Sequence, residues 1–257
     1  MTERVEIVSP APILNTPDFP FAFGGERGNE IPKNEKGHSY CFEFVALPGM
    51  VFTLLERCSE HIFRVCHPTY RQADLFLDIR FAKPGRLEKA RLVPPKETIL
   101  SRMKNLKGKP YVWGGNWSAG IPELLALYPP KGVLDEKTRA FWTLEGVDCS
   151  GLLYEASLGA TPRNTSQLIH FGESLRIGGM KPSAIVPLLE PLDMIVYPGH
   201  VLFVLDSLSF IESKFPFGVI QRDLNARFEE IFRERKGIDE WNAGFDPETH
   251  FLIRRIA

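Results

Sequence analysis

The stretch 147–154 (VDCSGLLY) places Cys149 between an acidic residue and the start of an apolar helical run. This pattern mounts a thiol at the first turn of a helix, where unpaired backbone N–H groups and the positive end of the helix dipole favour the thiolate. The thiolate is the nucleophilic form of cysteine. We therefore predict that Cys149 is a catalytic nucleophile, and that its own backbone N–H donates to the oxyanion formed on attack.

A nucleophilic thiol needs a base and a third group that orients the base. The segment 187–197 reads as a turn followed by a strand, 200–206 as a second strand, and 210–213 as a third. His200 opens one strand and Glu212 lies on its neighbour, so we expect the carboxylate to reach across to the imidazole. The pattern predicts a triad in which His200 takes the proton of Cys149 and later gives it to the leaving group.

Four short motifs make the chain resemble the NlpC-type cysteine peptidases, which are bacterial cell-wall endopeptidases with a papain-like core. The motifs are, in order, residues 110–115 (PYVWGG), 148–151 (DCSG), 162–165 (PRNT) and 199–201 (GHV). The resemblance implies an α+β fold in which the helix that carries the cysteine packs on an antiparallel sheet. It also implies hydrolysis of the γ-D-glutamyl–diamino-acid bond of peptidoglycan stem peptides, through a thioester acyl-enzyme.

The chain departs from the family pattern in two places. Glu212 stands where the family more often has histidine, although a carboxylate also suits the task of accepting the imidazole N–H. In addition, residues 116–147 separate the glycine pair from Asp148, where the family usually has a short link. A link of that length is rarely without structure inside a compact domain. We predict helical pieces at 122–128 and 136–142, which either decorate the surface or form a lid over the cleft.

The resemblance also implies residues that surround the nucleophile. Tyr111 would line the cleft and Trp113 would form part of its wall. Asp148 and Ser150 would hold the free amine and the backbone of the substrate. A carboxylate beside the nucleophile is a suitable anchor for an ammonium group, but Asp and Ser are also preferred helix caps, and both roles are compatible.

A second group of candidate substrate contacts is the loop of Arg163, Asn164 and Thr165. This loop could meet the D-glutamyl carboxylate, because arginine is suited to a bidentate clamp on a carboxylate. The alternative is an ordinary arginine on the protein surface.

The predicted domain order is an extended arm at 1–36, a small all-β SH3-like barrel at 37–92, and the papain-like catalytic domain at 96–257 with its insertion at about 116–147. The arm is rich in Pro and Gly, and we expect Phe19, Phe21 and Phe23 to anchor it on a neighbouring domain. Short strands at 40–46, 50–56, 62–66 and 75–81 suggest a barrel, and the resemblance indicates the bacterial SH3-like type. A helix at 96–107, an amphipathic helix from Leu224 and a strand at 251–256 complete the catalytic domain.

The composition of the chain limits the kinds of partner that we expect it to bind. The chain has 257 residues, 44% of them hydrophobic and 25% charged, with a net charge of -1, so it offers no electrostatic case for nucleic acid or for an anionic membrane. It has no run of about 18 apolar residues, so we expect no membrane insertion. The start, Met1–Glu6, lacks the features of a secretory signal, and we expect a cytoplasmic protein, or a periplasmic one if a leader has been removed.

We predict neither a metal nor a cofactor. The spacing of Cys58, His61, Cys66 and His67 is not that of a paired zinc site, and no phosphate-binding or dinucleotide motif occurs in the chain. The expected partners are peptidoglycan stem peptides or muropeptides. Two other functions stay open: a papain-like acyltransferase or amidase, and a catalytically idle module that binds the cell wall.

Overall fold

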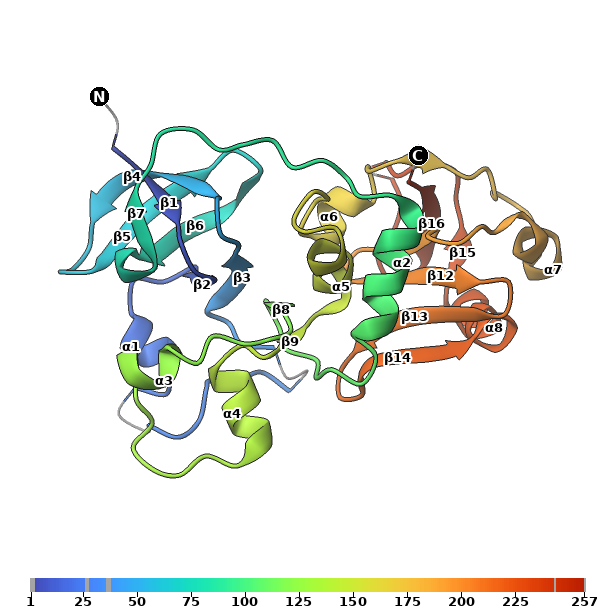
Figure 1. The fold of residues 1–257 in the computed structure, drawn as a ribbon. Helices are drawn as coiled ribbons and strands as arrows, with labels where there is room; N and C mark the ends of the chain where they lie inside the picture. The colour runs from blue at the N-terminus through green and yellow to red at the C-terminus, as the bar shows by residue number, and fades with distance from the viewer. Residues whose placement is uncertain (1–2, 26–27, 36–37, 243, 257) are drawn as a thin grey trace. The chain divides into compact units, whose positions relative to one another are not determined.

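The computed structural model describes residues 3–25, 28–35, 38–242 and 244–256, and they form two units (Figure 1). Unit 1 comprises Met1–Leu92 and Lys109–Asp148, and unit 2 comprises Val93–Gly108 and Cys149–Ala257. Each unit is built on a mainly antiparallel sheet with helices around it, which agrees with the predicted α+β class. Residues 109–148 group with the N-terminal unit, whereas the predicted catalytic domain includes them.

Unit 1 contains a seven-stranded sheet in the order β3-β2-β6-β5-β4-β1-β7, with antiparallel neighbours. Its strands are β1 (Arg4–Ile7), β2 (Ala11–Leu14), β3 (Phe42–Ala46), β4 (Val51–Arg57), β5 (Ile62–His67), β6 (Tyr70–Asp78) and β7 (Ala82–Pro84). The predicted strands at 40–46, 50–56 and 62–66 are confirmed, and the one at 75–81 ends early in a 3-10 turn, η1 (Ile79–Phe81). The SH3-like character of this unit stays a prediction.

Residues 4–14 are not an extended arm. Strand β1 pairs with β4 and β7, and β2 pairs with β3 and β6. The β2–β6 register begins at Ile13, so Pro12 lies outside that ladder and its missing N–H interrupts no bond there. All four residues of β2 are buried, so this strand belongs to the core of unit 1. The predicted boundary at residues 36 and 37 lies outside the described residues, as do residues 1, 2, 26 and 27 of the arm.

The predicted insertion is helical, as expected. It contains α3 (Leu124–Leu127) and α4 (Glu136–Trp142), and its ends meet where β8 (Asn116–Trp117) pairs with β9 (Gly146–Val147). The remaining helix of unit 1 is α1 (Phe19–Ala22).

Aromatic side chains bind this insertion to the N-terminal residues. Trp142 is fully buried and its Nε1 donates to the carbonyl oxygen of Tyr128 at 2.9 Å. Phe23 stacks on Tyr128 with the ring centroids 4.9 Å apart, and Phe19 lies 5.6 Å from the same ring. Phe19 and Phe23 are therefore anchors, whereas Phe21 is 53% exposed and its predicted anchoring role is wrong.

Unit 2 contains a sheet in the order β10-β16-β11-β12-β13-β14, with the short β15 beside β16 (Figure 1). Its strands are β10 (Glu173–Ser174), β11 (Met194–Tyr197), β12 (His200–Asp206), β13 (Ser209–Lys214), β14 (Gly218–Asp223), β15 (Lys236–Gly237) and β16 (His250–Arg255). Its helices are α2 (Lys96–Asn105), α5 (Cys149–Ala156), α6 (Thr165–Leu168), α7 (Pro182–Ile185), the 3-10 turn η2 (Val186–Leu188) and α8 (Leu224–Glu234). The predicted helices near 96–107 and 224 and the closing strand are confirmed.

Strand β12 is almost continuously apolar because both of its faces are covered. Leu202 and Val204 share a buried cluster with Phe228 of α8. Val201 and Phe203 point to the opposite face, since side chains alternate along a strand, and they are also fully buried. Helix α5 contacts β12 and β13, and α8 contacts β13 and β14. The central hairpin of unit 2 is thus fixed from two sides, and this hairpin carries the predicted base.

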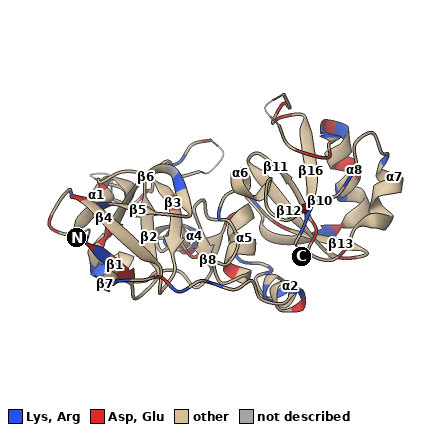
Figure 2. Ribbon diagram, turned by 90° about the horizontal axis from the view of Figure 1, so that it is seen from above, with Lys and Arg blue, Asp and Glu red and all other residues tan. Residues whose placement is uncertain are grey.

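Charged residues are mixed over both units. Figure 2 shows basic and acidic segments interspersed, and α2 carries both Glu97 and Arg102. Within the described ranges, no helix combines the length and the apolar character needed to cross a bilayer.

Candidate active site

Cys149 is the first residue of α5, which confirms that the cysteine opens a helix. Its Sγ lies 3.9 Å from the carbonyl oxygen of Gly199. Because Gly199 directly precedes His200, the thiol lies beside the turn from which the predicted base begins its strand. The residue is buried, with 6% of its surface exposed. The helix start therefore presents a shielded thiol next to the β11–β12 turn.

His200 and Glu212 meet as the predicted hairpin requires. Phe203 lies opposite Ile211 in the β12–β13 register, so Glu212 shares a face of the sheet with His200, two positions along the ladder. The Nε2 atom of His200 is 2.7 Å from Oε2 of Glu212. This bond occupies one ring nitrogen, which leaves Nδ1 as the atom that can exchange a proton with a thiol.

Arg227 is the residue that the sequence analysis missed. Its Nε donates to Oε1 of Glu212 at 2.9 Å, and its Nη2 donates to Oε2 at 3.1 Å. Arg227 comes from α8, where it is buried like its neighbour Phe228. A signal was present, because Arg227 lies three residues after Leu224 and so shares the apolar face of the predicted helix.

The Glu212 carboxylate is therefore held by a cation on one side and an imidazole on the other. Glu212 is completely buried, and burial alone would raise its pKa. The hydrogen bond and charge of His200, followed by those of Arg227, instead lower the pKa of Glu212 to about 2. The carboxylate thus stays ionised at any physiological pH, as required to stabilise an imidazolium.

Three of the four sequence motifs converge in unit 2. The Sγ of Cys149 in the second motif approaches Gly199 in the fourth. The hydroxyl of Thr165, from the loop motif, accepts the N–H of Gly199 at 3.2 Å. The Nη1 of Arg163, from the same loop, donates to the hydroxyl of Ser150 at 2.9 Å. The loop therefore links the first turn of α5 to the turn before His200.

Arg163 is not the solvent-exposed arginine that was the alternative reading. Only 4% of its surface is exposed, and its guanidinium is bonded to Ser150 inside unit 2. A contact between Arg163 or Thr165 and a substrate carboxylate stays a prediction.

The other predicted site residues belong to unit 1. Asp148 is buried, and its Oδ2 accepts the N–H of Gly114 at 3.1 Å, so it holds the turn of the glycine pair. Gly114 has a φ of +74°, and an added Cβ there would meet Cβ of Phe42 at 3.0 Å, so this turn requires glycine. Trp113 stacks on His38 at 3.8 Å between ring centroids, and Tyr111 is buried. Their roles toward substrate stay predictions.

Cys58, His61, Cys66 and His67, whose spacing was considered for a metal site, all belong to unit 1. His67 is bonded through Nε2 to Glu88 at 2.7 Å and through Nδ1 to Thr69 at 2.8 Å. In the part of the chain that the structure describes, no three His, Cys, Asp or Glu side chains are grouped so that they could hold a metal ion.

Replacing Arg227 by methionine is expected to raise the pKa of Glu212, because burial is then opposed mainly by His200. With a folded-state pKa of about 2, below the ordinary 4.5, Glu212 stabilises the fold above pH 4.5, and this stabilisation is lost as the pH falls toward 2. In Arg227→Met the folded-state pKa lies closer to 4.5, so the loss of stability on acidification should be smaller and should end at a higher pH. The variant should also be about 3–5 kcal/mol less stable at neutral pH, because a buried charge loses its partner. Thermal unfolding midpoints measured as a function of pH test both expectations.

Arg233→Met is the matched control. Arg233 lies on the same helix, its side chain is 75% exposed, and it is 3.9 Å from Glu229. Such a surface pair contributes little, so the control should unfold like the wild type at every pH. Equal acid sensitivity of Arg227→Met and the wild type would show that Arg227 does not set the ionisation of Glu212.

Neither a protein-family model nor a curated protein matches the chain. Solved structures do align with it. An NlpC/P60 family protein from Bacillus cereus aligns at a TM-score of 0.38 and 17% identity, over 99% of this chain and 63% of that one. RipD from Mycobacterium tuberculosis, described as a non-catalytic NlpC/P60 domain protein adapted to peptidoglycan binding, aligns at 0.37 and 18% identity, over 63% and 97%. The P60 domain of an M. avium subspecies paratuberculosis antigen aligns at 0.36 and 23% identity, over 62% and 93%.

These neighbours are NlpC/P60 proteins. The sequence motifs predicted the same family. The chain spans 63% of the length of the Bacillus cereus protein.

Proposed function

We propose that this chain is a cysteine peptidase that hydrolyses the γ-D-glutamyl–diamino-acid bond of peptidoglycan stem peptides. The observation that supports it most directly is a single arrangement in unit 2. The thiol of Cys149 lies beside the Gly199 turn, and His200, the next residue, is bonded at 2.7 Å to a fully buried carboxylate. Burying that charge is costly, and at this position the carboxylate would stabilise the imidazolium that forms when His200 takes the thiol proton.

In the proposed reaction, His200 Nδ1 takes the thiol proton of Cys149, and the thiolate attacks the γ-carbonyl carbon of the D-glutamyl residue. The resulting oxyanion accepts the backbone N–H of Cys149 at the start of α5. Collapse breaks the C–N bond, and His200 gives its proton to the departing amine of the diamino acid. Water, deprotonated by His200, then attacks the thioester carbon. The C–S bond breaks, the free γ-carboxylate is released, and His200 returns the proton to the thiolate of Cys149. Glu212 stabilises the imidazolium during both steps.

Mass spectrometry of stem peptides incubated with the full chain tests the proposal. The expected products are L-Ala-γ-D-Glu and a peptide that begins with the diamino acid. A ligated product in the presence of an added amine would instead indicate an acyltransferase. No change in mass, with the peptide still bound, would indicate a wall-binding module without catalysis.

We further propose that the substrate is a free muropeptide whose L-Ala amine pairs with Asp148, the residue that precedes the nucleophile. Glu56 of β4 is a second, more speculative candidate for this contact, and it pairs with Arg64 at 3.3 Å. An N-acetylated peptide cannot form the ion pair. A charge-assisted contact at a desolvated site contributes about 2–3 kcal/mol, or roughly a hundredfold in kcat/KM. We therefore expect L-Ala-γ-D-Glu-diaminopimelate to be cleaved about a hundredfold faster than its N-acetyl form. Equal rates on the two peptides would favour an enzyme of intact cell wall.

A further inference from the structure

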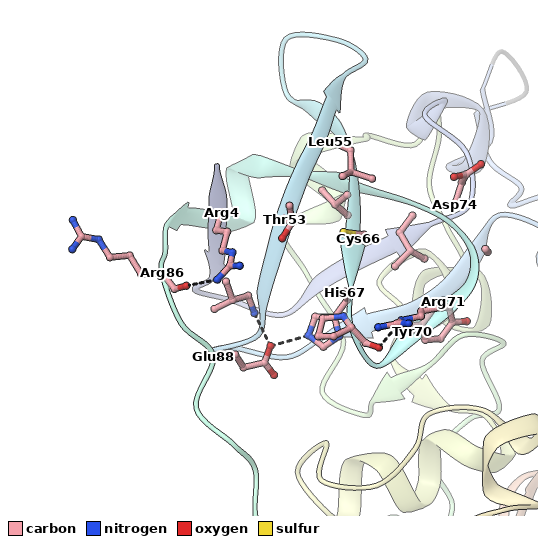
Figure 3. Close-up of a pocket in the computed structure, with 15 residues that line it drawn as sticks. Arg4, Thr53, Leu55, Cys66, His67, Tyr70, Arg71, Asp74, Arg86 and Glu88 are labelled. Atoms are coloured by element: carbon pink, nitrogen blue, oxygen red, sulfur yellow. Dashed lines mark hydrogen bonds and ion pairs between the residues drawn. The ribbon is translucent and has the colours of Figure 1, made fainter. Parts of the chain in front are cut away.

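Unit 1 has a pocket of about 610 Å³ over strands β1, β4, β5 and β6 of its sheet (Figure 3). A row of side chains crosses it, because Arg4 of β1 lies opposite Thr53 of β4, and Thr53 lies opposite Cys66 of β5. Residues directly opposite each other in a sheet point to the same face. Leu55 also lines the pocket and is 50% exposed, so the pocket offers apolar surface to solvent.

The two carboxylates of the pocket already contact other neighbours. Asp74 lies 3.5 Å from Nη1 of Arg64. Glu88 lies 2.7 Å from Nε2 of His67, whose side chain is 2% exposed, and it accepts the N–H of Val51 at 3.0 Å. These contacts join both carboxylates to groups other than the arginines that line the same pocket, among them Arg4 and Arg71.

Two of those arginines are oriented without being neutralised. Nη1 of Arg4 donates to the carbonyl oxygen of Arg86 at 3.1 Å, and Nε of Arg71 donates to the carbonyl oxygen of Pro68 at 3.2 Å. Among the described residues, neither guanidinium has a carboxylate within ion-pair distance. Figure 3 shows Arg4 and Arg71 on opposite sides of Thr53 and Cys66, whereas the side chain of Arg86 extends away. The pocket thus combines the positively charged side chains of Arg4 and Arg71, each oriented by a hydrogen bond, with the apolar surface of Leu55.

We propose that this pocket binds a small organic anion, with its carboxylate or phosphate between Arg4 and Arg71 and its apolar body against Leu55. Guanidinium groups match both kinds of anion through paired N–H donors. The pocket volume is in the range of small-molecule sites, which combine apolar surface with a few placed polar groups. This binding does not depend on the peptidase activity, because every residue involved belongs to unit 1.

Two exposed free cysteines allow a direct test, because Cys66 lines the pocket and Cys58 does not. The full chain is alkylated with anionic iodoacetate or with neutral iodoacetamide, and the rate at each cysteine is followed by peptide mass spectrometry. For each cysteine we take the ratio of its rate with iodoacetate to its rate with iodoacetamide. This ratio cancels the differences in exposure and in thiolate content between the two cysteines. We expect this ratio to be at least about threefold higher at Cys66 than at Cys58 at low salt, and the difference to shrink at high salt. Equal ratios at both cysteines would overturn the proposal.

Ligand protection tests the apolar body and the head group. Octanoate and octyl phosphate should each slow the reaction of Cys66 with iodoacetamide and leave Cys58 unaffected, and the more protective one identifies the preferred head group. Octanol, which lacks the charge, should protect at least about tenfold less well. Equal protection by octanol would mean a purely apolar pocket and would also overturn the proposal.

Arg4→Gln and Arg71→Gln should each weaken protection by octanoate about tenfold, because each removes one charge-assisted contact. Arg86→Gln is the matched control. Arg86 also lines the pocket, but it supplies only its main-chain carbonyl to Arg4, so the variant should bind like the wild type. An equal loss in all three variants would reduce the effect to overall charge and contradict a site between Arg4 and Arg71.

Discussion

Replacing Cys149 by alanine is expected to lower kcat for the stem peptide by about four orders of magnitude or more, because the thioester can no longer form. The fold should persist, since removing one sulfur atom from α5 leaves only a small gap. Cys149→Ser should also be nearly inactive, because a hydroxyl is a far weaker acid than a thiol. Product formation by mass spectrometry measures the loss, and the thermal unfolding midpoint checks the fold.

Cys41→Ala is the matched control, because Cys41 is also a buried free cysteine and lies in unit 1. Its activity should equal that of the wild type. Iodoacetamide should modify Cys149 faster than Cys41, since the two are similarly buried and only Cys149 lies at a helix start beside a histidine. Turnover of muropeptides by Cys149→Ala at the wild-type rate would remove the basis of the proposed mechanism.

Replacing Glu212 by alanine should lower kcat by about a thousandfold with little change in KM, because Glu212 acts on His200 and not on the substrate. Glu212→Gln should lose less, since the amide oxygen can still accept the imidazole N–H but cannot stabilise its charge. Steady-state kinetics on the stem peptide separate kcat from KM. The matched control is Glu230→Gln, because Glu230 pairs with the same Arg227 at 3.1 Å but makes no contact with His200. A loss in Glu230→Gln as large as in Glu212→Ala would point to general damage to the network.

The family preference for histidine at position 212 gives a second test of the same carboxylate. In this chain Glu212→His would leave Arg227 buried without its main anionic partner. The single variant should therefore be unstable, and its activity should be partly restored in Glu212→His combined with Arg227→Met. If the double variant were no more active than the single one, Arg227 would not be the reason that this chain uses glutamate.

The sequence alone determined the local parts of the candidate site. Short-range patterns predict both the helix that begins at Cys149 and the three strands from Met194 to Lys214. The helix is indicated by small residues at its start, and the strands by apolar runs and by the Pro-Gly turn between the first two of them. Once the hairpin is recognised, pleat and register place Glu212 on the same face as His200. Helices inside the insertion were predictable for the same reason, because their apolar spacing lies within one segment.

Only the tertiary structure decided which distant segments meet. It assigned residues 4–14 to a sheet that a Pro-rich composition seemed to exclude, and it joined the insertion to Phe19 and Phe23. It also buried Arg163 against Ser150 and brought Arg227 to Glu212. None of these pairs shares a helix turn or a hairpin, so no periodicity connects them. Their meeting depends on how whole elements pack, because a buried charge is tolerated only where another element delivers its partner.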